Sequence, residues 1–410
     1  MKQMKHVIIG VGAAGISAAK TIRKHRSGDE IVIISKDSAV YSRCMLHKYI
    51  GGGRSEAALS FIPDDFFETN NIRWLSGVTV TGVDSKKKLV SFDGGSESYG
   101  RLLIATGARS VIPPVGGLSG AENVFGLRGL EDAKAIREYA ARTDNIVIIG
   151  AGLVGLDAAY GLVEMGKKPT IVDMAGSILT MNLDVRAASV YQAKFEEAGC
   201  SFRLGRKISG TVNDASGNVT AITLDNGEQL PCGLVIAAAG VRPAVEFLAD
   251  SGITCGQGGA VSVDKYLAAS AEGVYAAGDA AGLSGIWPSA VRQGKIAALN
   301  MCEEHVEYSD AFSAKNTVNF FGITSLSAGQ MKPSDGDLEY CREARGGYEK
   351  YILRDGVPVG VVLQGDISYS GLWQYMIKNK IKAAAVSKPV WKLSFADFYG
   401  MRPNGEYKWP

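Results

Sequence analysis

Two segments of the chain share one pattern of apolar and polar positions. In the first, the β-branched run His6–Ile9 is followed by a glycine-rich turn and by a stretch of small and apolar residues from Ile16 to about Lys24. A second apolar run, Ile31–Ile34, closes the unit. Unbroken apolar runs of this length are typical of parallel strands buried on both faces, and the stretch between them predicts a helix. The N-terminus is therefore predicted to form a strand–helix–strand unit.

The same pattern returns about 140 residues later. The apolar run Asn145–Ile149 precedes a glycine-rich turn, a helix is expected from Leu156 to about Met165, and the strand Pro169–Asp173 follows. Two such units predict the α/β class, with two Rossmann-like doubly wound domains.

The turn of each unit has the spacing Gly-x-Gly-x-x-Gly. Its members are Gly10, Gly12 and Gly15, then Gly150, Gly152 and Gly155. In this motif the first glycine permits a tight turn, the second lets the backbone approach a pyrophosphate, and the third lets the helix pack on the strand. The helix N-terminus presents free N–H groups to the anion. One such motif is a weak signal, but both have the expected strand and helix around them, so two dinucleotide sites are favoured over two purely structural turns.

Three further apolar strands end in glycine turns: Leu102–Gly107, Leu234–Gly240 and Gly273–Asp279. Ligands of doubly wound sheets bind at the carboxyl ends of the strands. The candidate contacts at these ends are Ala105, Thr106, Gly107, Gly240, Gly278 and Asp279.

The remaining patterns are shorter. β-rich pieces are expected at Gly77–Val83, Lys88–Phe92 and Gly210–Leu224. Beyond about Asp310, strand-like runs at Thr317–Phe321 and Val357–Gln364 and a helix at Ser370–Lys380 predict a separate C-terminal α+β domain.

Composition narrows the possible partners. The chain has 410 residues, enough for two to four domains, and its net charge of +2 is spread along the sequence, which argues against nucleic acid as a partner. The six cysteines form no CxxC pair, so no metal site is expected. Neither a signal peptide nor a run of ~18 apolar residues is present, which favours the cytoplasm and no membrane span.

These motifs, in this order, resemble the FAD-dependent pyridine nucleotide-disulfide oxidoreductases over essentially the whole chain. The resemblance implies that the first glycine motif binds FAD, that the second binds NAD(P)H, and that Asp279 contacts the ribityl–phosphate arm of the flavin. It also implies an FAD domain made of residues 1–111 and 236–310, an NAD(P)H domain at 112–235, and a C-terminal interface or dimerisation domain at 311–410.

The stretch Tyr41–Lys48 is most similar to rubredoxin and ferredoxin reductases and to the flavin part of assimilatory nitrite reductase. In those relatives the equivalent of Arg43 contacts FAD phosphate, and the equivalent of Lys48 lies near the flavin N5, paired with an acid. Here that acid is Asp157, one methylene shorter than the usual Glu. A cation beside the flavin would stabilise negative charge as hydride arrives, whereas the alternative is a solvated loop lysine.

The strand ends indicate which nucleotide is held. Asp173, about 20 residues after the second motif, suits the ribose 2′-OH of NADH and would repel the phosphate of NADPH, although it could simply cap the next turn. In the first unit Ser35, Lys36 and Asp37 occupy this place. The FAD ribose is then held by Asp37, by Ser35 or by neither.

Cys44 divides the functional hypotheses. Carrier-protein reductases usually have Pro at this position, whereas coenzyme A disulfide reductases and related NADH oxidases and peroxidases have a redox cysteine there. A thiolate beside the flavin and Lys48 would have a lowered pKa. We favour the other interpretation, a small buried residue, and interpret His47 as a loop residue. Trp287 is expected near the flavin ring, although packing explains it as well.

The predicted function is transfer of hydride from NADH to FAD and of electrons to a rubredoxin- or ferredoxin-type carrier or a partner subunit. The alternatives are a coenzyme A disulfide or persulfide reductase or an NADH oxidase or peroxidase acting through Cys44, and a structural or redox-sensing subunit. The tail Phe395–Pro410 contains Tyr399, Tyr407 and Trp409, which suits a partner surface. A homodimer through the C-terminal domain is the arrangement of the cysteine-dependent relatives.

Overall fold

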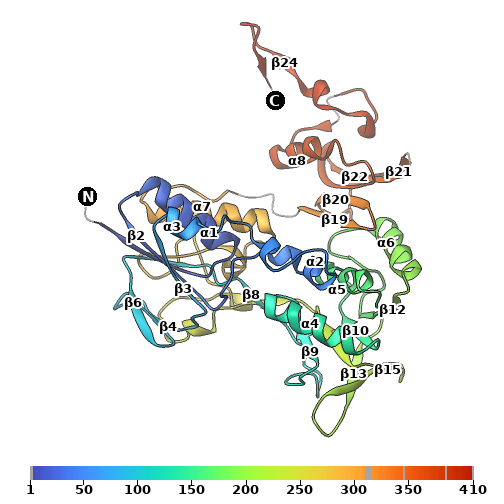
Figure 1. Cartoon of the computed structure of the whole chain (residues 1–410). Coiled ribbons are helices and arrows are strands. Elements are labelled where there is room, and N and C mark those ends of the chain that lie inside the picture. The colour runs from blue at the N-terminus through green and yellow to red at the C-terminus, as the bar shows by residue number, and fades with distance from the viewer. Residues whose placement is uncertain (1–2, 310–314, 345–346, 384–385, 409–410) are drawn as a thin grey trace.

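The computed structural model describes residues 3–309, 315–344, 347–383 and 386–408. Within these ranges the chain forms two parallel sheets and one antiparallel sheet of five strands each, with smaller antiparallel pieces beside them. In Figure 1 the N-terminal sheet lies on the left, the second parallel sheet on the lower right, and the C-terminal part above it. The predicted α/β class, with two doubly wound units and a C-terminal α+β part, is confirmed.

The first sheet has the order β18-β7-β1-β2-β3, and all its strand pairs are parallel. Its strands are β1 (Lys5–Ile9), β2 (Glu30–Ser35), β3 (Ile72–Ser76), β7 (Arg101–Ile104) and β18 (Val274–Ala276). The predicted runs His6–Ile9 and Ile31–Ile34 fall within β1 and β2 and are buried throughout. Burial on both faces explains why these strands are continuously apolar.

The second sheet has the order β12-β11-β10-β16-β9, again with parallel pairs. Its strands are β9 (Val124–Gly126), β10 (Ile146–Ile149), β11 (Thr170–Asp173), β12 (Ser201–Leu204) and β16 (Leu234–Ala237). Strand β10 is central and fully buried, like β1 in the first sheet. The repeat found in the sequence is therefore a repeat of architecture.

The helix after each glycine motif begins earlier than the sequence predicted. Helix α1 (Ala13–His25) starts directly after Gly12, and α5 (Leu153–Glu164) starts directly after Gly152. The expected starts, Ile16 and Leu156, were wrong by three residues, because the last glycine of each motif lies inside the first helical turn. The N-terminus of each helix is thereby brought to the end of the preceding strand.

The other helices pack around these sheets. They are α2 (Leu46–Ile50), α3 (Phe66–Thr69), α4 (Leu130–Arg142), α6 (Val185–Glu197) and α7 (Trp287–Met301). Short helix α2 follows the first sheet in sequence but packs on α4 and α5, where Leu46 and Ile50 share a buried cluster with Ile136, Leu156 and Leu162. Figure 1 shows α2 beside α5. The segment around Lys48 thus connects the two nucleotide-binding units.

Three antiparallel pieces flank the sheets. They are β4 (Val80–Asp84), β5 (Leu89–Phe92) and β6 (Gly95–Ser98); β13 (Ile208–Asn213), β14 (Val219–Leu224) and β15 (Gln229–Pro231); and the ribbon of β8 (Ala108–Ser110) with β17 (Val241–Pro243). Strand β8 leads from the first unit into the second, and β17 leads back out of it. Because these two strands pair, the ribbon joins the two units. The β-rich interpretation of these segments is confirmed.

The C-terminal part is a sheet of order β19-β20-β23-β22-β21 with helix α8 (Ser370–Asn379) on one face. Its strands are β19 (Lys315–Phe320), β20 (Ile323–Gly329), β21 (Leu338–Ala344), β22 (Gly347–Arg354) and β23 (Val357–Gln364), and β24 (Gly400–Met401) pairs with β25 (Tyr407–Lys408) in the tail. The opposite face packs on α6, where the Tyr191 hydroxyl donates to Ser325 Oγ at 2.8 Å. No helix in the described ranges is long and apolar enough to cross a membrane. The predicted tail residues Trp409 and Pro410 lie outside the described residues.

Candidate functional site

A cavity of about 920 Å³ opens at the carboxyl ends of the first sheet. Its lining comes from all the predicted motifs of this unit: the glycine turn at Gly10 and Gly12, the end of β2, the end of β7 at Thr106, and the late motif at Asp279. Ligand pockets for small molecules are usually ~300–1,000 Å³, so this space suits a large ligand such as a dinucleotide. The sequence motifs therefore meet at one site.

The glycine turn leaves room where a phosphate would lie. Gly10 adopts φ +108°, and a Cβ there would collide with the carbonyl of Ala105, so only glycine fits. A Cβ on Gly15 would collide with the Gly10 carbonyl, whereas a Cβ on Gly12 would meet no atom within 4 Å. Gly12 is also the N-cap of α1 and has no side chain to cap the helix. The first-turn N–H groups consequently face open space, as anion binding requires.

Thr106 supplies a separate indication of a ligand. Its hydroxyl is buried and has no hydrogen-bond partner among the described residues, yet the residue lines the cavity. A buried hydroxyl without a partner costs about 1–3 kcal/mol, so a ligand that hydrogen-bonds to it is expected to stabilise the site. Together with the open glycine turn, this residue fits FAD.

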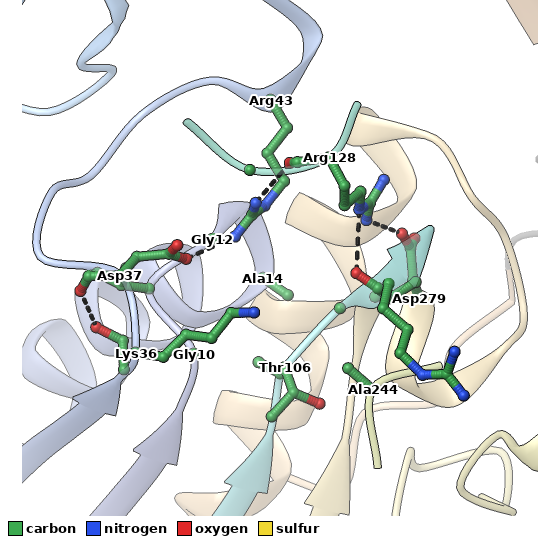
Figure 2. A pocket seen from close by; sticks show the side chains of 18 of the residues that line it. Gly10, Gly12, Ala14, Lys36, Asp37, Arg43, Thr106, Arg128, Ala244 and Asp279 are labelled. Atoms are coloured by element: carbon green, nitrogen blue, oxygen red, sulfur yellow. Dashed lines mark hydrogen bonds and ion pairs between the residues drawn. The ribbon is translucent and has the colours of Figure 1, made fainter. Parts of the chain in front are cut away.

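Asp279 is held by an arginine that the sequence analysis did not select. Arg128, two residues before α4, forms an ion pair with the Asp279 carboxylate, and its Nε donates to the carbonyl of Ala108 at 3.2 Å. Figure 2 shows both side chains converging above the turn that follows β7. Arg128 joins the second unit to the late motif of the first, which no sequence spacing could show.

Arg43 and Asp37 form a second ion pair at the rim. Arg43 donates to Asp37 at 2.6 Å, to the Tyr41 hydroxyl at 3.0 Å and to the carbonyl of Arg128 at 2.7 Å. Asp37 thus orients the cation that was predicted to contact FAD phosphate, as Figure 2 shows. Ser35 Oγ donates to the carbonyl of Asp37 at 2.8 Å and accepts from Trp74. Ser35 therefore stabilises its own turn.

The turn of the second unit is built in the same way. Gly150 adopts φ +111°, and a Cβ on Gly155 would collide with the Gly150 carbonyl, whereas Gly152 has nothing within 4 Å. Asp173 accepts from the backbone N–H of Ala151, inside this turn, at 2.6 Å and from that of Ala175 at 2.7 Å. The carboxylate thus fixes the turn, and its remaining lone pairs are available for ribose hydroxyls.

The predicted pair of Lys48 with Asp157 is replaced by another. Lys48 Nζ lies 3.0 Å from Glu164 Oε1 and 4.5 Å from the centre of the Tyr160 ring. Asp157 lies about two turns earlier on α5, where its Oδ1 is 3.8 Å from His47 Nδ1. Short helix α2 thus brings Lys48 to Glu164 and His47 to Asp157. We correct the predicted Lys48–Asp157 pair accordingly.

Two groups in this cluster have strongly shifted pKa values. Burial raises the pKa of Asp157 to about 7, an effect that the nearby Lys48 charge opposes. Burial, assisted by the same charge, lowers the pKa of His47 to about 4. His47 is therefore neutral at pH 7 and lies within short helix α2, so our interpretation of it as a loop residue was wrong.

Cys44 lines the cavity and is exposed to it, so the expected buried position is wrong. Burial of its thiol on the protein side, with the negative charges of Asp157 and Asp279, raises its pKa, although Arg128 acts in the opposite direction. The protein's own groups therefore raise the pKa of this thiol and do not lower it toward that of a redox thiolate. All six cysteines in the chain are free.

Five predicted candidates remain, and four of them line the cavity. Gly278 N–H donates to Gln293 at 2.8 Å at the start of the Asp279 turn, and Trp287 begins α7 and packs edge-on against Phe61 at 4.8 Å. Lys36 and Gly107 line the cavity with them, whereas Gly240 lies between β16 and β17, where an added Cβ would meet no atom within 4 Å. Within the described residues no cluster of three or more His, Cys, Asp or Glu is placed to hold a metal.

The fold and the site define a protein with two dinucleotide sites, one on each parallel sheet. Residues 4–294 match the family model described as pyridine nucleotide-disulphide oxidoreductase, and residues 315–381 match that of the rubredoxin NAD+ reductase C-terminal domain. The chain belongs to the pyridine nucleotide-disulphide oxidoreductase family, as the resemblance predicted. It is an oxidoreductase that uses FAD and NAD(H).

Two curated relatives support this assignment. The subunit epsilon of an NADH-dependent phenylglyoxylate dehydrogenase from Aromatoleum evansii is 30% identical over 396 residues, which cover 93% of each chain. An NADH oxidase from Methanocaldococcus jannaschii is 34% identical over 79% of this chain and 77% of its own length. Both are named for NADH, in agreement with the preference inferred from Asp173.

Solved structures share the fold. The putidaredoxin reductase–putidaredoxin complex aligns with a TM-score of 0.82 at 24% identity, covering 95% of this chain and 97% of that one. The NADH:rubredoxin oxidoreductase of Clostridium acetobutylicum aligns with a TM-score of 0.75 at 24% identity, covering 94% and 98%.

Proposed function

We propose that this chain carries electrons from NADH, through FAD, to a one-electron protein acceptor or partner subunit. The observation that carries the proposal is the state of Cys44. Burial, together with the charges of Asp157 and Asp279, raises the pKa of its thiol, and the cation Lys48 is held by Glu164. Without an activated thiolate, reduction of a disulfide, of oxygen or of peroxide through Cys44 is disfavoured, and transfer to a protein is favoured. Relatives named for rubredoxin and for an electron transfer subunit agree with this outlet.

The two glycine turns and their neighbours have separate parts in this scheme. The FAD pyrophosphate and the groups next to it would be held by Gly10, Gly12, Gly15 and Thr106. Asp279 and Arg43 would contact the ribityl–phosphate arm of FAD. The second glycine turn and Asp173 would hold NADH. When bound, FAD supplies hydride acceptance from NADH and one-electron release. Overall, one NADH becomes NAD+, two one-electron acceptors are each reduced once, and one proton is released.

The protein's own groups would orient and shield this chemistry. Lys48 would keep a positive charge near the flavin, and Glu164 and the Tyr160 ring fix its position. Trp287 and Phe61 would cover the edge of the cavity and limit the approach of water. The domain division at residues 112–235 belongs to the same proposal, as does a cytoplasmic location, which six free thiols support.

A second candidate is reduction of a disulfide or persulfide through Cys44. It is favoured by the exposure of Cys44 and by its place in the lining of the cavity. In this case the thiol would first have to lose its proton, although the nearby carboxylates disfavour the thiolate. Binding of FAD or of the substrate would need to offset this effect.

Anaerobic titration of the flavin with NADH, and separately with dithionite, distinguishes the two. For wild type and Cys44→Ser we expect the same bleaching and an uptake of one two-electron equivalent per FAD. A long-wavelength charge-transfer band and a second equivalent, both lost in Cys44→Ser, would favour the second candidate. An oxidised spectrum that NADH leaves unchanged would exclude both.

A further inference from the structure

Helix α7 carries two buried amide side chains on one of its faces. Gln293 is 0% exposed and Asn300 is 7% exposed. They lie seven residues apart, or about two helical turns, so their side chains leave the same side of the helix. A buried amide costs free energy unless its polar ends are hydrogen-bonded. The partners of each side chain therefore show what that side chain holds in place.

Gln293 contacts the turn that begins the late motif. Its Oε1 accepts from the backbone N–H of Gly278 at 2.8 Å, and its Nε2 donates to the Tyr308 hydroxyl at 3.2 Å. Because a backbone N–H can only donate, this contact fixes which end of the amide faces the turn. The amide oxygen is thus committed to the residue directly before Asp279.

Gly278 is the point at which the chain turns out of the first sheet. Strand β18 ends at Ala276, and Gly278 adopts φ +73°, in the left-handed region that favours glycine. Gly278 lines the cavity and begins the short turn that carries Asp279. Glycine has no side chain to restrict its own conformation, so its neighbours must define it. The Gln293 amide supplies a fixed acceptor for its N–H within the core.

Asp279 is thereby held in two different ways. Arg128 forms an ion pair with its carboxylate at the cavity, as Figure 2 shows, whereas Gln293 fixes the backbone one residue earlier. The first contact orients the Asp279 side chain. The second sets the position of the turn from which that side chain extends. Loss of the Gln293 acceptor should therefore move the carboxylate even though Arg128 is intact.

We propose that Gln293 is a positioning residue for FAD, which acts by holding the turn of Gly278 and Asp279 in the conformation that receives the cofactor. The inference rests on the proposed contact of Asp279 with FAD and does not depend on the electron acceptor. It gives a buried residue of α7 a part in cofactor binding although it does not line the cavity. Its effect should be seen first in the affinity for FAD.

The same helix offers a matched comparison. The Asn300 amide donates to the carbonyls of Tyr266 and Val306 and accepts from the Val306 N–H, and none of these groups belongs to the late motif. If buried amides of α7 served only to pack the helix, loss of either should affect FAD equally. A positioning role confines the effect on FAD to Gln293.

The test starts from purified holoprotein of each variant. Serial dilution followed by flavin fluorescence gives the Kd of FAD, and visible circular dichroism at saturating FAD reports on the surroundings of the bound flavin. Gln293→Met keeps the length of the side chain and removes the carbonyl acceptor. Gln293→Glu restores an acceptor, and at about pH 6 burial favours its protonated form, which can also donate to Tyr308. Asn300→Leu is the control, and Asp279→Ala tests the proposed contact itself.

We expect Gln293→Met to raise the Kd of FAD about tenfold and to change the visible circular dichroism. Gln293→Glu at pH 6 should stay within threefold of wild type. Asn300→Leu should lower the melting temperature with Kd and visible spectrum unchanged. Tyr308→Phe, which removes only the hydroxyl that orients the amide, should raise the Kd about two- to fivefold and serves if Gln293→Met yields no folded protein.

Two kinds of result would contradict the inference, and they can be told apart. A weakened FAD site in Asp279→Ala, with wild-type Kd in Gln293→Met and Tyr308→Phe, would overturn the role of Gln293 alone. Equal losses of FAD in Gln293→Met, Gln293→Glu and Asn300→Leu would do the same, because the effect would then follow packing of α7. An unchanged Kd in Asp279→Ala would overturn the proposed contact with FAD and the inference with it.

Discussion

At the residue scale, the cluster around Lys48 contains two groups whose pKa shifts have opposite consequences. The pKa of Asp157 is raised to about 7 from 3.8, so the folded protein binds its proton more tightly than the unfolded chain. The Asp157 carboxyl therefore lowers the free energy of unfolding progressively as the pH rises from about 4 to 7. The pKa of His47 is lowered to about 4 from 6.5, so its contribution becomes unfavourable as the pH falls through that interval. Single substitutions should separate the two.

Asp157→Asn should raise the thermal midpoint at pH 8 and change it little at pH 4.5, because only the ionised carboxylate is unfavourable. We expect the free energy of unfolding to rise by about 1–2 kcal/mol, which corresponds to roughly 2–4 °C in the thermal midpoint. This is less than the full pKa shift would give, because 31% of the Asp157 side chain is accessible to solvent. His47→Gln should show the reverse, with its gain at pH 4.5. Circular dichroism melts of the three holoproteins at both pH values measure this, and equal shifts at both would contradict it.

The sequence predicted which residues line the cavity better than it predicted their partners. Gly10, Gly12 and Asp279 lie in motifs whose spacing follows from local backbone geometry, so a linear pattern identifies them. Arg128 and Glu164 reach their partners Asp279 and Lys48 through tertiary packing over more than a hundred residues. Choosing Asp157 as partner of Lys48 failed because the partner depends on where along α5 the short helix α2 packs.

At the element scale, the contact between α1 and α7 fixes the nucleotide-facing end of α1. Gly294 on α7 lies so close to Ala14 that a Cβ would collide with the carbonyl of Ala14, in the first turn of α1. Gly294→Ala should push the helices apart, cost about 1–3 kcal/mol and lower the FAD content, since the N–H groups facing the cavity would move. The control Gly28→Ala introduces the same methyl where nothing lies within 4 Å.

The flavin-to-protein ratio of the purified variants, from absorbance, measures this effect. Full FAD content in Gly294→Ala, with an unchanged melting temperature, would show that the contact does not position α1. The periodicity of the sequence predicted α1 and its neighbouring strands. It could not show that the position of α1 depends on a glycine of another helix, some 280 residues away.

At the scale of the whole molecule, the hydrophobic cores do not coincide with the sequence blocks. One cluster contains Leu46 and Ile50 from the N-terminal block, Leu156 and Leu162 from the second unit, and Phe320 from the C-terminal sheet. A second cluster under α8 is built entirely from the C-terminal part. The C-terminal part is thus tied to the nucleotide-binding units by one face of its sheet and has a core of its own on the other.

This arrangement predicts that damage to the second core stays local. Trp373 is 2% exposed and packs 4.7 Å from the Tyr351 ring between α8 and the sheet, so Trp373→Ala should cost about 3–5 kcal/mol. Because the cavity residues lie in other clusters, we expect the C-terminal part to melt first and FAD to remain bound. Melts followed by circular dichroism and by flavin fluorescence should give separate midpoints in the variant, with release of flavin near the wild-type temperature. If both signals instead fall together at the lower temperature, the C-terminal sheet and the flavin site form one cooperative unit. The two parts would then be joined through the buried cluster that contains Phe320.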